Sequence, residues 1–94
     1  MNRPIQVGDL VISLTGRDKN KCFLVVDVVK TRVKLVDGKT HKIYSPKTKN
    51  IKHIKLILAT NLNEIVENIK QGKPVSNKKV YKLINAKNQK LQED

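Results

Sequence analysis

Residues 9–29 read DLVISLTGRDKNKCFLVVDVV, an alternating apolar segment and a continuous apolar segment separated by a basic turn. Alternation is typical of a half-buried strand, so Leu10, Ile12 and Leu14 are expected on one face. Gly16 permits a turn with positive φ, or a close backbone approach that a Cβ would block. The stretch therefore predicts a hairpin that presents cations at its tip.

The first 58 residues are organised as short strands separated by turns. The expected strands are Leu10–Thr15, Cys22–Val29, Arg32–Val36, Lys39–Tyr44 and Ile51–Leu58. Asp37-Gly38 predicts a two-residue hairpin turn between the third strand and the fourth, because a type I′ turn needs positive φ at both positions. Closure removes the exposed edges of such a sheet, so the pattern favours a closed or nearly closed barrel.

After Leu58 the apolar residues recur with the period of a helix. The recurring positions are Leu62, Ile65, Val66 and Ile69. Asn61 and Glu64 approximate a capping box, and Gly72 is a natural stop, so a first helix is expected over residues 62–71. After Gly72 the sequence again shows residues that are typical of the start of a helix.

A second helix is expected after Ser76, whose side chain can cap it. Val75 can pack on Val80 as a hydrophobic staple across this cap. Neither helix is long enough to be stable alone. Both are therefore expected to dock on each other, on the barrel or on a partner.

The chain of 94 residues carries 20 Lys and Arg against 8 Asp and Glu, a formal net charge of +12. Such an excess predicts a polyanionic partner, with nucleic acid as the first choice. Residues 1–58 hold 13 of the cations and 4 of the acids, so the barrel is expected to be the main electrostatic surface. Residues 59–94 are expected to form a helical hairpin that braces the barrel or binds a partner.

The apolar segments are too short for a membrane span, which needs about 18 or more consecutive apolar residues. A membrane surface is also disfavoured as a partner, because the bases lie among strand and turn residues rather than along one helix face. The single cysteine, Cys22, excludes an internal disulfide framework and a cysteine zinc site. A cytoplasmic monomer without cofactor or metal is expected.

The hairpin tip is the first predicted binding cluster, since single residues separate its three cations. A turn fans such side chains out toward neighbouring phosphates. A second basic cluster surrounds the loop Ser45–Asn50, which Pro46 partly preorganises. The residues predicted to contact RNA are Arg17, Lys19, Asn20, Lys21, Arg32, Lys34, Lys39, His41, Lys42, Tyr44, Lys47, Lys49, Lys52, His53 and Lys55, with Gly16 and Gly38 as structural turn residues.

Two predictions within this set have alternatives. Arg32 and Lys34 flank Val33, so they either continue the basic surface or form the solvated side of an ordinary strand. Tyr44 is either a stacking platform for a base or a residue of the core or barrel rim, whereas Phe23 is expected inside the barrel. With so few aromatic residues, the chain is poorly equipped for sequence-tolerant capture of single strands.

Catalysis has little support in the sequence. His41 and His53 lie among lysines, and no third ligand type clusters with them. The aspartates of the first half lie near strand ends and turns, where turn chemistry or charge compensation explains them. Neither a Gly-rich phosphate loop nor a nucleophile elbow is present. The chain is therefore not expected to be an enzyme.

Four segments together resemble the KOW motif, in the branch found in large-subunit ribosomal proteins of archaea and eukaryotes and in short bacterial relatives. They are Gly8-Asp9-Leu10-Val11, Gly16 with Asn20-Lys21, Val25-Val26-Asp27-Val28 and Leu35-Val36-Asp37-Gly38. The resemblance covers residues 6–58 and implies a barrel of the Src-homology-three type, RNA binding and ribosome association, with no catalytic activity. Binding roles carry over to the tip cations. Asn20 and Phe23 stand where many KOW motifs have glycine.

The predicted fold is mainly β, a small five-stranded barrel of the Src-homology-three type followed by two short α-helices. The predicted function is noncatalytic binding of structured, ribosomal RNA through basic barrel loops, with ribosomal proteins as further partners. The alternative is a KOW-type protein-interaction module that contacts the transcription or translation machinery. Salt dependence and nuclease sensitivity separate the two hypotheses.

Overall fold

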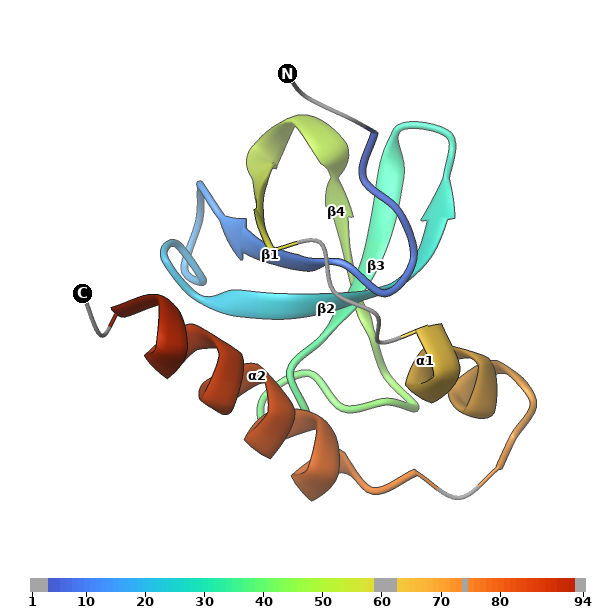
Figure 1. Ribbon diagram of the computed structural model, residues 1–94. Coiled ribbons are helices and arrows are strands. Elements are labelled where there is room, and N and C mark those ends of the chain that lie inside the picture. Colours follow the sequence, from blue (N-terminus) through green and yellow to red (C-terminus); the bar gives the residue numbers. More distant parts are fainter. Residues whose placement is uncertain (1–3, 59–62, 74, 93–94) are drawn as a thin grey trace.

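The computed structural model describes residues 4–58, 63–73 and 75–92, and it consists of one antiparallel sheet followed by two helices (Figure 1). The strands are β1 (Leu10–Ser13), β2 (Cys22–Val29), β3 (Arg32–Val36), β4 (Lys47–Asn50) and β5 (Ile54–Leu58). A short 3-10 helix, η1 (Ile51–His53), connects β4 to β5, and the two α-helices are α1 (Asn63–Lys70) and α2 (Asn77–Gln92). The order of elements along the chain agrees with the predicted strands followed by helices.

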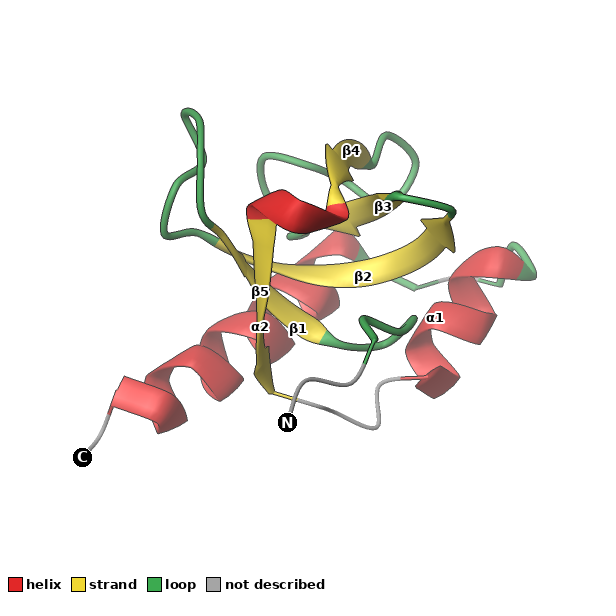
Figure 2. Cartoon of the chain, turned by 90° about the horizontal axis from the view of Figure 1, so that it is seen from above, coloured by secondary structure: helices red, strands yellow, loops and turns green. Residues whose placement is uncertain are grey.

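The sheet is strongly curled, and hydrogen bonds between the described residues do not close it into a barrel. Its strand order is β4-β3-β2-β1-β5, so β4 and β5 lie at opposite edges. Only the three residues of η1 connect these two edges, which requires the sheet to bend back on itself (Figure 2). An irregularity in β2 between Val25 and Asp27 supports the bend, because a bulge increases local twist.

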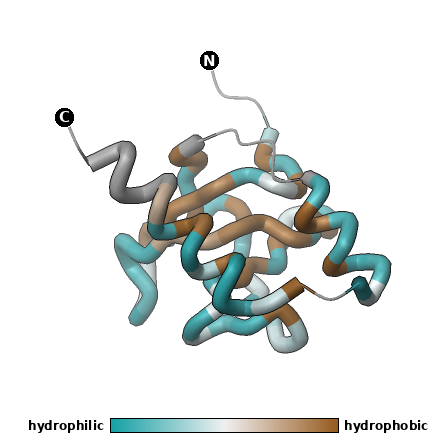
Figure 3. Tube along the Cα trace, turned by 60° about the horizontal axis from the view of Figure 1, so that its bottom comes forward, coloured by the Kyte–Doolittle hydropathy of each residue, from teal (hydrophilic) through white to brown (hydrophobic). Residues whose placement is uncertain are grey.

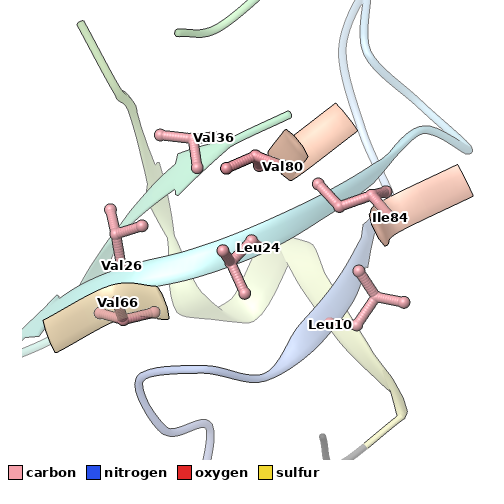
Figure 4. Packing of buried hydrophobic residues seen from close by; sticks show 7 residues of the cluster. All are labelled: Leu10, Leu24, Val26, Val36, Val66, Val80 and Ile84. Carbon is pink, nitrogen blue, oxygen red and sulfur yellow. The ribbon is translucent and has the colours of Figure 1, made fainter. Parts of the chain in front are cut away.

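Both faces of the sheet are buried, each against its own hydrophobic cluster. The inner cluster, inside the curl, consists of Val11, Phe23, Val25, Val33, Leu35 and Ile54. The outer cluster combines the sheet residues Leu10, Leu24, Val26 and Val36 with the helix residues Val66, Val80 and Ile84 (Figure 4). Figure 3 shows the apolar segments gathered in the central strands and the hydrophilic ones along the surrounding loops. The helices and the sheet therefore share one core.

The burial of both faces corrects the prediction of a one-sided first strand. Leu10 is buried as expected, but Leu14 lies beyond the strand and is 41% exposed. Val11 and Ser13, on the face opposite to Leu10, are fully buried. The curl covers the inner face and the helices cover the outer one, so alternation could not identify a single buried face. Phe23 is fully buried, which confirms its expected place.

The helices begin and end where local signals predict. The Ser76 hydroxyl accepts a hydrogen bond from the Lys79 backbone N–H at 3.0 Å, which confirms the cap of α2. At the end of α1, Gly72 has a φ of 74° and its N–H donates to the Ile69 carbonyl at 3.1 Å. The positive φ and this hydrogen bond confirm the predicted stop of α1. The capping-box position Asn61 and the apolar position Leu62 lie outside the described residues.

The predicted strand Lys39–Tyr44 is wrong. Residues 37–46 form a loop, and the fourth strand is Lys47–Asn50, within the segment predicted to be a loop. The Asp37 carboxylate accepts hydrogen bonds from the backbone N–H groups of Lys39 (2.9 Å) and His41 (2.8 Å), which turn the chain away from an extended course.

The predicted type I′ turn at Asp37-Gly38 is also wrong, because only its glycine has positive φ. The tight turn of the sheet lies instead at Lys30-Thr31, between β2 and β3, where Lys30 has a φ of 56°. This position carries no glycine or asparagine, so the usual sequence signal for such a turn is missing.

The loop of residues 37–46 packs closely against the first turns of α2. The Ile43 backbone N–H donates to the Asn77 side-chain oxygen at 2.8 Å. Gly38 has a φ of 81°, and a Cβ at this position would overlap the Asn77 carbonyl and lie 2.8 Å from the Tyr81 backbone nitrogen. Gly38 is therefore required for the close approach of the loop to the helix.

We expect Gly38→Ala to lower the free energy of unfolding by about 2–4 kcal/mol, since it adds a backbone clash to the strain of a positive φ. Gly72→Ala is the matched control. It has a φ of 74° with nothing within 4 Å of the added Cβ, so only the strain of about 1 kcal/mol applies. Chemical denaturation of both variants measures the difference. Equal losses of stability would contradict the close packing of the loop on α2.

Candidate nucleic-acid interface

The hairpin tip, residues 14–21, is an eight-residue loop held by its own backbone hydrogen bonds. The Asn20 N–H donates to the Ser13 carbonyl at 2.8 Å, and the Lys19 N–H donates to the Gly16 carbonyl at 3.2 Å. Gly16 has a φ of 81° and Asn20 a φ of 70°. The positive φ predicted at Gly16 is confirmed, and Asn20 adopts the left-handed conformation that asparagine tolerates better than most residues. The tip therefore has a defined backbone course.

Asp18 is the one acidic residue of the tip, and it points into the molecule. Its side chain is 6% exposed. Its Oδ1 atom accepts hydrogen bonds from the Ser13 hydroxyl at 2.7 Å and from Lys49 Nζ at 2.8 Å, while Lys47 Nζ lies 2.9 Å from Oδ2. Lys49 Nζ also donates to the Thr15 carbonyl at 2.8 Å. One carboxylate thus joins the tip to two lysines of β4.

These contacts span the inner side of the curled sheet. Ser13 shares a face of β1 with Val11 of the inner cluster, and Lys49 of β4 is paired with Val33, also of that cluster. Strands β2 and β3 lie between β1 and β4 in the sheet. Asp18 therefore connects two strands that the hydrogen-bond ladder does not connect.

The environment of Asp18 favours its ionised form. Burial by itself raises the pKa of this carboxyl, but the hydrogen bonds from Lys49, Lys47 and Ser13 outweigh burial and hold its pKa well below the ordinary value of 3.8. At neutral pH the network therefore contains a carboxylate between two ammonium groups. The negative charge of the tip is neutralised internally.

The structure separates the predicted binding residues into two groups. The exposed ones are Arg17, Lys19, Asn20, Lys21, Arg32, Lys34, Lys39, Lys42, Tyr44, Lys52 and Lys55. The partly buried ones are His41, His53, Lys47 and Lys49. The Lys49 side chain is only 9% exposed and is engaged by Asp18, so its role is structural. The partner of Lys49 lies 31 positions away in the chain, and no local signal predicts this contact.

Two aromatic groups near the loop of residues 37–46 differ in exposure. Tyr44 is 76% exposed, so its alternative assignment to the core is wrong, and its ring is accessible for stacking. His41 packs against the buried Phe23 ring, with centroids 5.7 Å apart. His41 is therefore partly a packing residue.

All four aspartates of the first 58 residues serve as hydrogen-bond acceptors. Beside Asp18 and Asp37, Asp9 accepts from the Gln6 N–H at 2.8 Å and Asp27 from the Val28 N–H at 2.9 Å. Asp9 is 2% exposed. The acids of this region are thus engaged in contacts within the fold, whereas most of its predicted cations face solvent.

The exposed cations gather at different places. Lys21 of the tip and Lys39 of the loop of residues 37–46 line one groove together with residues of α2. Arg32 and Lys34 lie beside Val29 and Thr48 in a depression on strands β2, β3 and β4. Lys52 belongs to η1 and Lys55 to β5. The groove residues Tyr81 and Asn85 of α2 were not among the predicted binding residues, because only the docking of α2 brings them close to the tip.

Within the described ranges, no three His, Cys, Asp or Glu side chains are close enough together to hold a metal ion. In the same part of the chain, no helix has the length and apolar character needed to cross a membrane. Neither a scan against protein-family models nor a search of curated proteins finds a match to this chain. The function must therefore be inferred from the residues and their arrangement.

We expect Asp18→Asn to lower the free energy of unfolding by about 2–4 kcal/mol at neutral pH, because it leaves two lysines without their buried counter-charge. Asp27→Asn is the control: its carboxylate lies 3.9 Å from Lys70 at the surface, and its loss should cost about 0.5 kcal/mol or less.

The effect of Asp18→Asn should also depend on pH. The pKa of Asp18 is lower in the folded protein than in the unfolded chain, so its stabilisation is fully present above about pH 4 and is lost as pH falls toward the folded pKa. Denaturation from neutral pH to about pH 2 should show the two proteins converging. A constant difference across this range would contradict an ionised Asp18 as the stabilising group.

Proposed function

We propose that this chain is a noncatalytic RNA-binding protein that grips structured RNA with its hairpin tip. The observation that carries the proposal is the inward orientation of Asp18, which leaves Arg17, Lys19 and Lys21 exposed on a turn of defined backbone course. Cations held on a rigid loop lose less conformational entropy on binding than cations on a flexible one. The tip is therefore suited to a fixed pattern of phosphates.

The fold supports the same proposal. We infer that the curled sheet is a variant of the five-stranded barrel of the Src-homology-three type, in which the Asp18 contacts connect the loop after β1 to the edge strand β4. Such a barrel with a basic loop between its first two strands is what the resemblance to KOW proteins implies. On this basis the RNA is ribosomal, and the protein is a cytoplasmic monomer associated with ribosomes.

The arrangement of the cations favours structured RNA over a free single strand. Phosphate contacts from Lys and Arg position a protein on a folded nucleic acid, whereas capture of single strands relies on several stacking platforms. Tyr44 is the one tyrosine or phenylalanine that is largely exposed among the described residues. The chain therefore offers many phosphate contacts and few stacking ones.

A protein-interaction module is the second candidate function. The observation that favours it is the depression beside Val29, which is 50% exposed between the cations Arg32 and Lys34. An apolar residue flanked by cations suits an acidic protein partner. The salt response of RNA binding decides between the two functions.

We expect affinity for a labelled ribosomal RNA hairpin to fall steeply with salt. If about 5–7 phosphates are neutralised, the slope of log affinity against log salt should be roughly −3.5 to −6, because each contact releases condensed counterions. Fluorescence anisotropy between about 50 and 300 mM salt measures this slope. A nearly flat response would reject the RNA proposal and favour the protein-interaction module.

The position of the cations should matter as well as their number. Replacing Arg17, Lys19 and Lys21 together by Ala should weaken binding of the same hairpin about tenfold or more and reduce the steepness of the slope by about 2–3. The control replaces Lys78, Lys79 and Lys82, three exposed cations of α2 with the same total charge. If both triple variants lose affinity equally, the attraction is diffuse and the tip is not a site.

A further inference from the structure

A groove of about 330 Å³ runs between the hairpin tip, the loop of residues 37–46 and α2. Its volume is at the lower end of the range typical of small-molecule sites, about 300–1,000 Å³. The lining residues that matter for its chemistry are Lys21, Lys39, Asn20, Asn85, Tyr81 and Asp37. Three segments that are far apart in the sequence therefore build one concave site beside the predicted binding cations.

The groove combines charged, aromatic and amide groups. Lys21 and Lys39 are exposed, and Lys39 Nζ lies 5.5 Å from the centroid of the Tyr81 ring. Asn20 and Asn85 contribute side-chain amides, for which the described residues show no hydrogen-bond partner. Ile84, only 4% exposed, contributes an apolar wall. The groove thus offers cations for a phosphate, a ring for stacking and amides for hydrogen bonding.

We propose that this groove takes one unpaired nucleotide of the bound RNA, an inference that rests on the RNA-binding function proposed above. Lys39 moves from the face of the Tyr81 ring to join Lys21 at the phosphate, and the base takes its place against the ring. Asn20 and Asn85 face the edge of the base, where a carboxamide can donate and accept at once. The groove shares Asn20 and Lys21 with the tip, so an RNA strand held there continues directly into it.

The charge distribution limits what the groove can hold. The Asp37 carboxylate is on its wall, and Oδ1 already accepts two backbone N–H groups. An ionised carboxylate repels a further phosphate, yet it can accept a hydrogen bond from the 2′-hydroxyl of a ribose. A single ribonucleotide with its phosphate near the two lysines satisfies these conditions. A base-paired duplex is too wide for a site of this size.

The test compares two RNA duplexes of identical sequence, one perfectly paired and one with a single bulged adenosine. Wild-type protein should bind the bulged duplex about tenfold more tightly, because a base stacked on an aromatic ring gains affinity that a paired base cannot. Tyr81→Leu should abolish this preference, so that the two duplexes bind with equal affinity. Tyr81→Phe should keep the preference, since the ring remains. Thermal melting of both variants verifies that they are folded.

Cys22 provides an independent measurement on the unaltered protein. It is the single cysteine of the chain and lines the groove, so alkylation of its thiol by N-ethylmaleimide reports on occupancy. At equal saturation, the bulged duplex should slow alkylation several-fold more than the perfect duplex. This comparison stands even if a Tyr81 variant fails to fold.

The outcomes separate the two proposals. Tight, salt-dependent binding of both duplexes, with neither a bulge preference nor extra protection of Cys22, overturns the nucleotide site and leaves the RNA-binding function intact. A bulge preference that survives in Tyr81→Leu also overturns the site. Absence of binding to either duplex, or binding that does not respond to salt, rejects the RNA-binding function itself.

Discussion

The contact of one buried carboxylate with two lysines links the hairpin tip to the edge strand β4 inside the curled sheet. Asp18 reaches from the loop after β1 to Lys47 and Lys49 of β4, on the inner side of the sheet. Since β1 and β4 are not neighbours in the hydrogen-bond ladder, this contact joins parts of the sheet that backbone pairing does not join. The same contact determines which charges of the hairpin tip remain exposed.

Stability and surface charge are therefore coupled in the first half of the chain. Replacing both members of a buried ion pair by apolar residues often costs little stability. Removing only one member is strongly destabilising, because the other charge is left buried and unpaired. Here Asp18 engages Lys47 and Lys49, two cations that would otherwise add to the positive surface. The same contacts orient the Asp18 carboxylate toward the interior. The remaining tip cations face solvent.

The helices have an equally direct role in the arrangement of the surface. Val66 of α1 and Val80 of α2 belong to the outer cluster, so the helices complete the core (Figure 4). The contact of Gly38 and Ile43 with the first turns of α2 then positions the loop of residues 37–46 beside the tip. The groove between tip, loop and helix exists because all three are held by the same packing. A fragment without the helices would lack one of its walls.

The sequence by itself determined the features that depend on near neighbours. The apolar runs defined β2 and β3 with their observed bounds, Ser76 and Gly72 marked a helix start and a helix end, and Gly16 permitted the positive φ that it adopts. These signals act over a few residues, where backbone conformation and side-chain chemistry are directly linked.

Tertiary structure decided what depends on residues far apart in the chain. Lys39–Tyr44 has the alternation of a strand, but the Asp37 turn and the contact with α2 fold it into a loop, and β4 forms from a polar segment instead. From the sequence, Lys49 is expected to be a surface cation; in the fold it contacts Asp18, 31 positions away. Tyr81 becomes part of a groove only when α2 docks. Strand pairing, ion pairs and grooves arise from contacts between residues that are far apart in the chain. A local sequence pattern therefore cannot predict them.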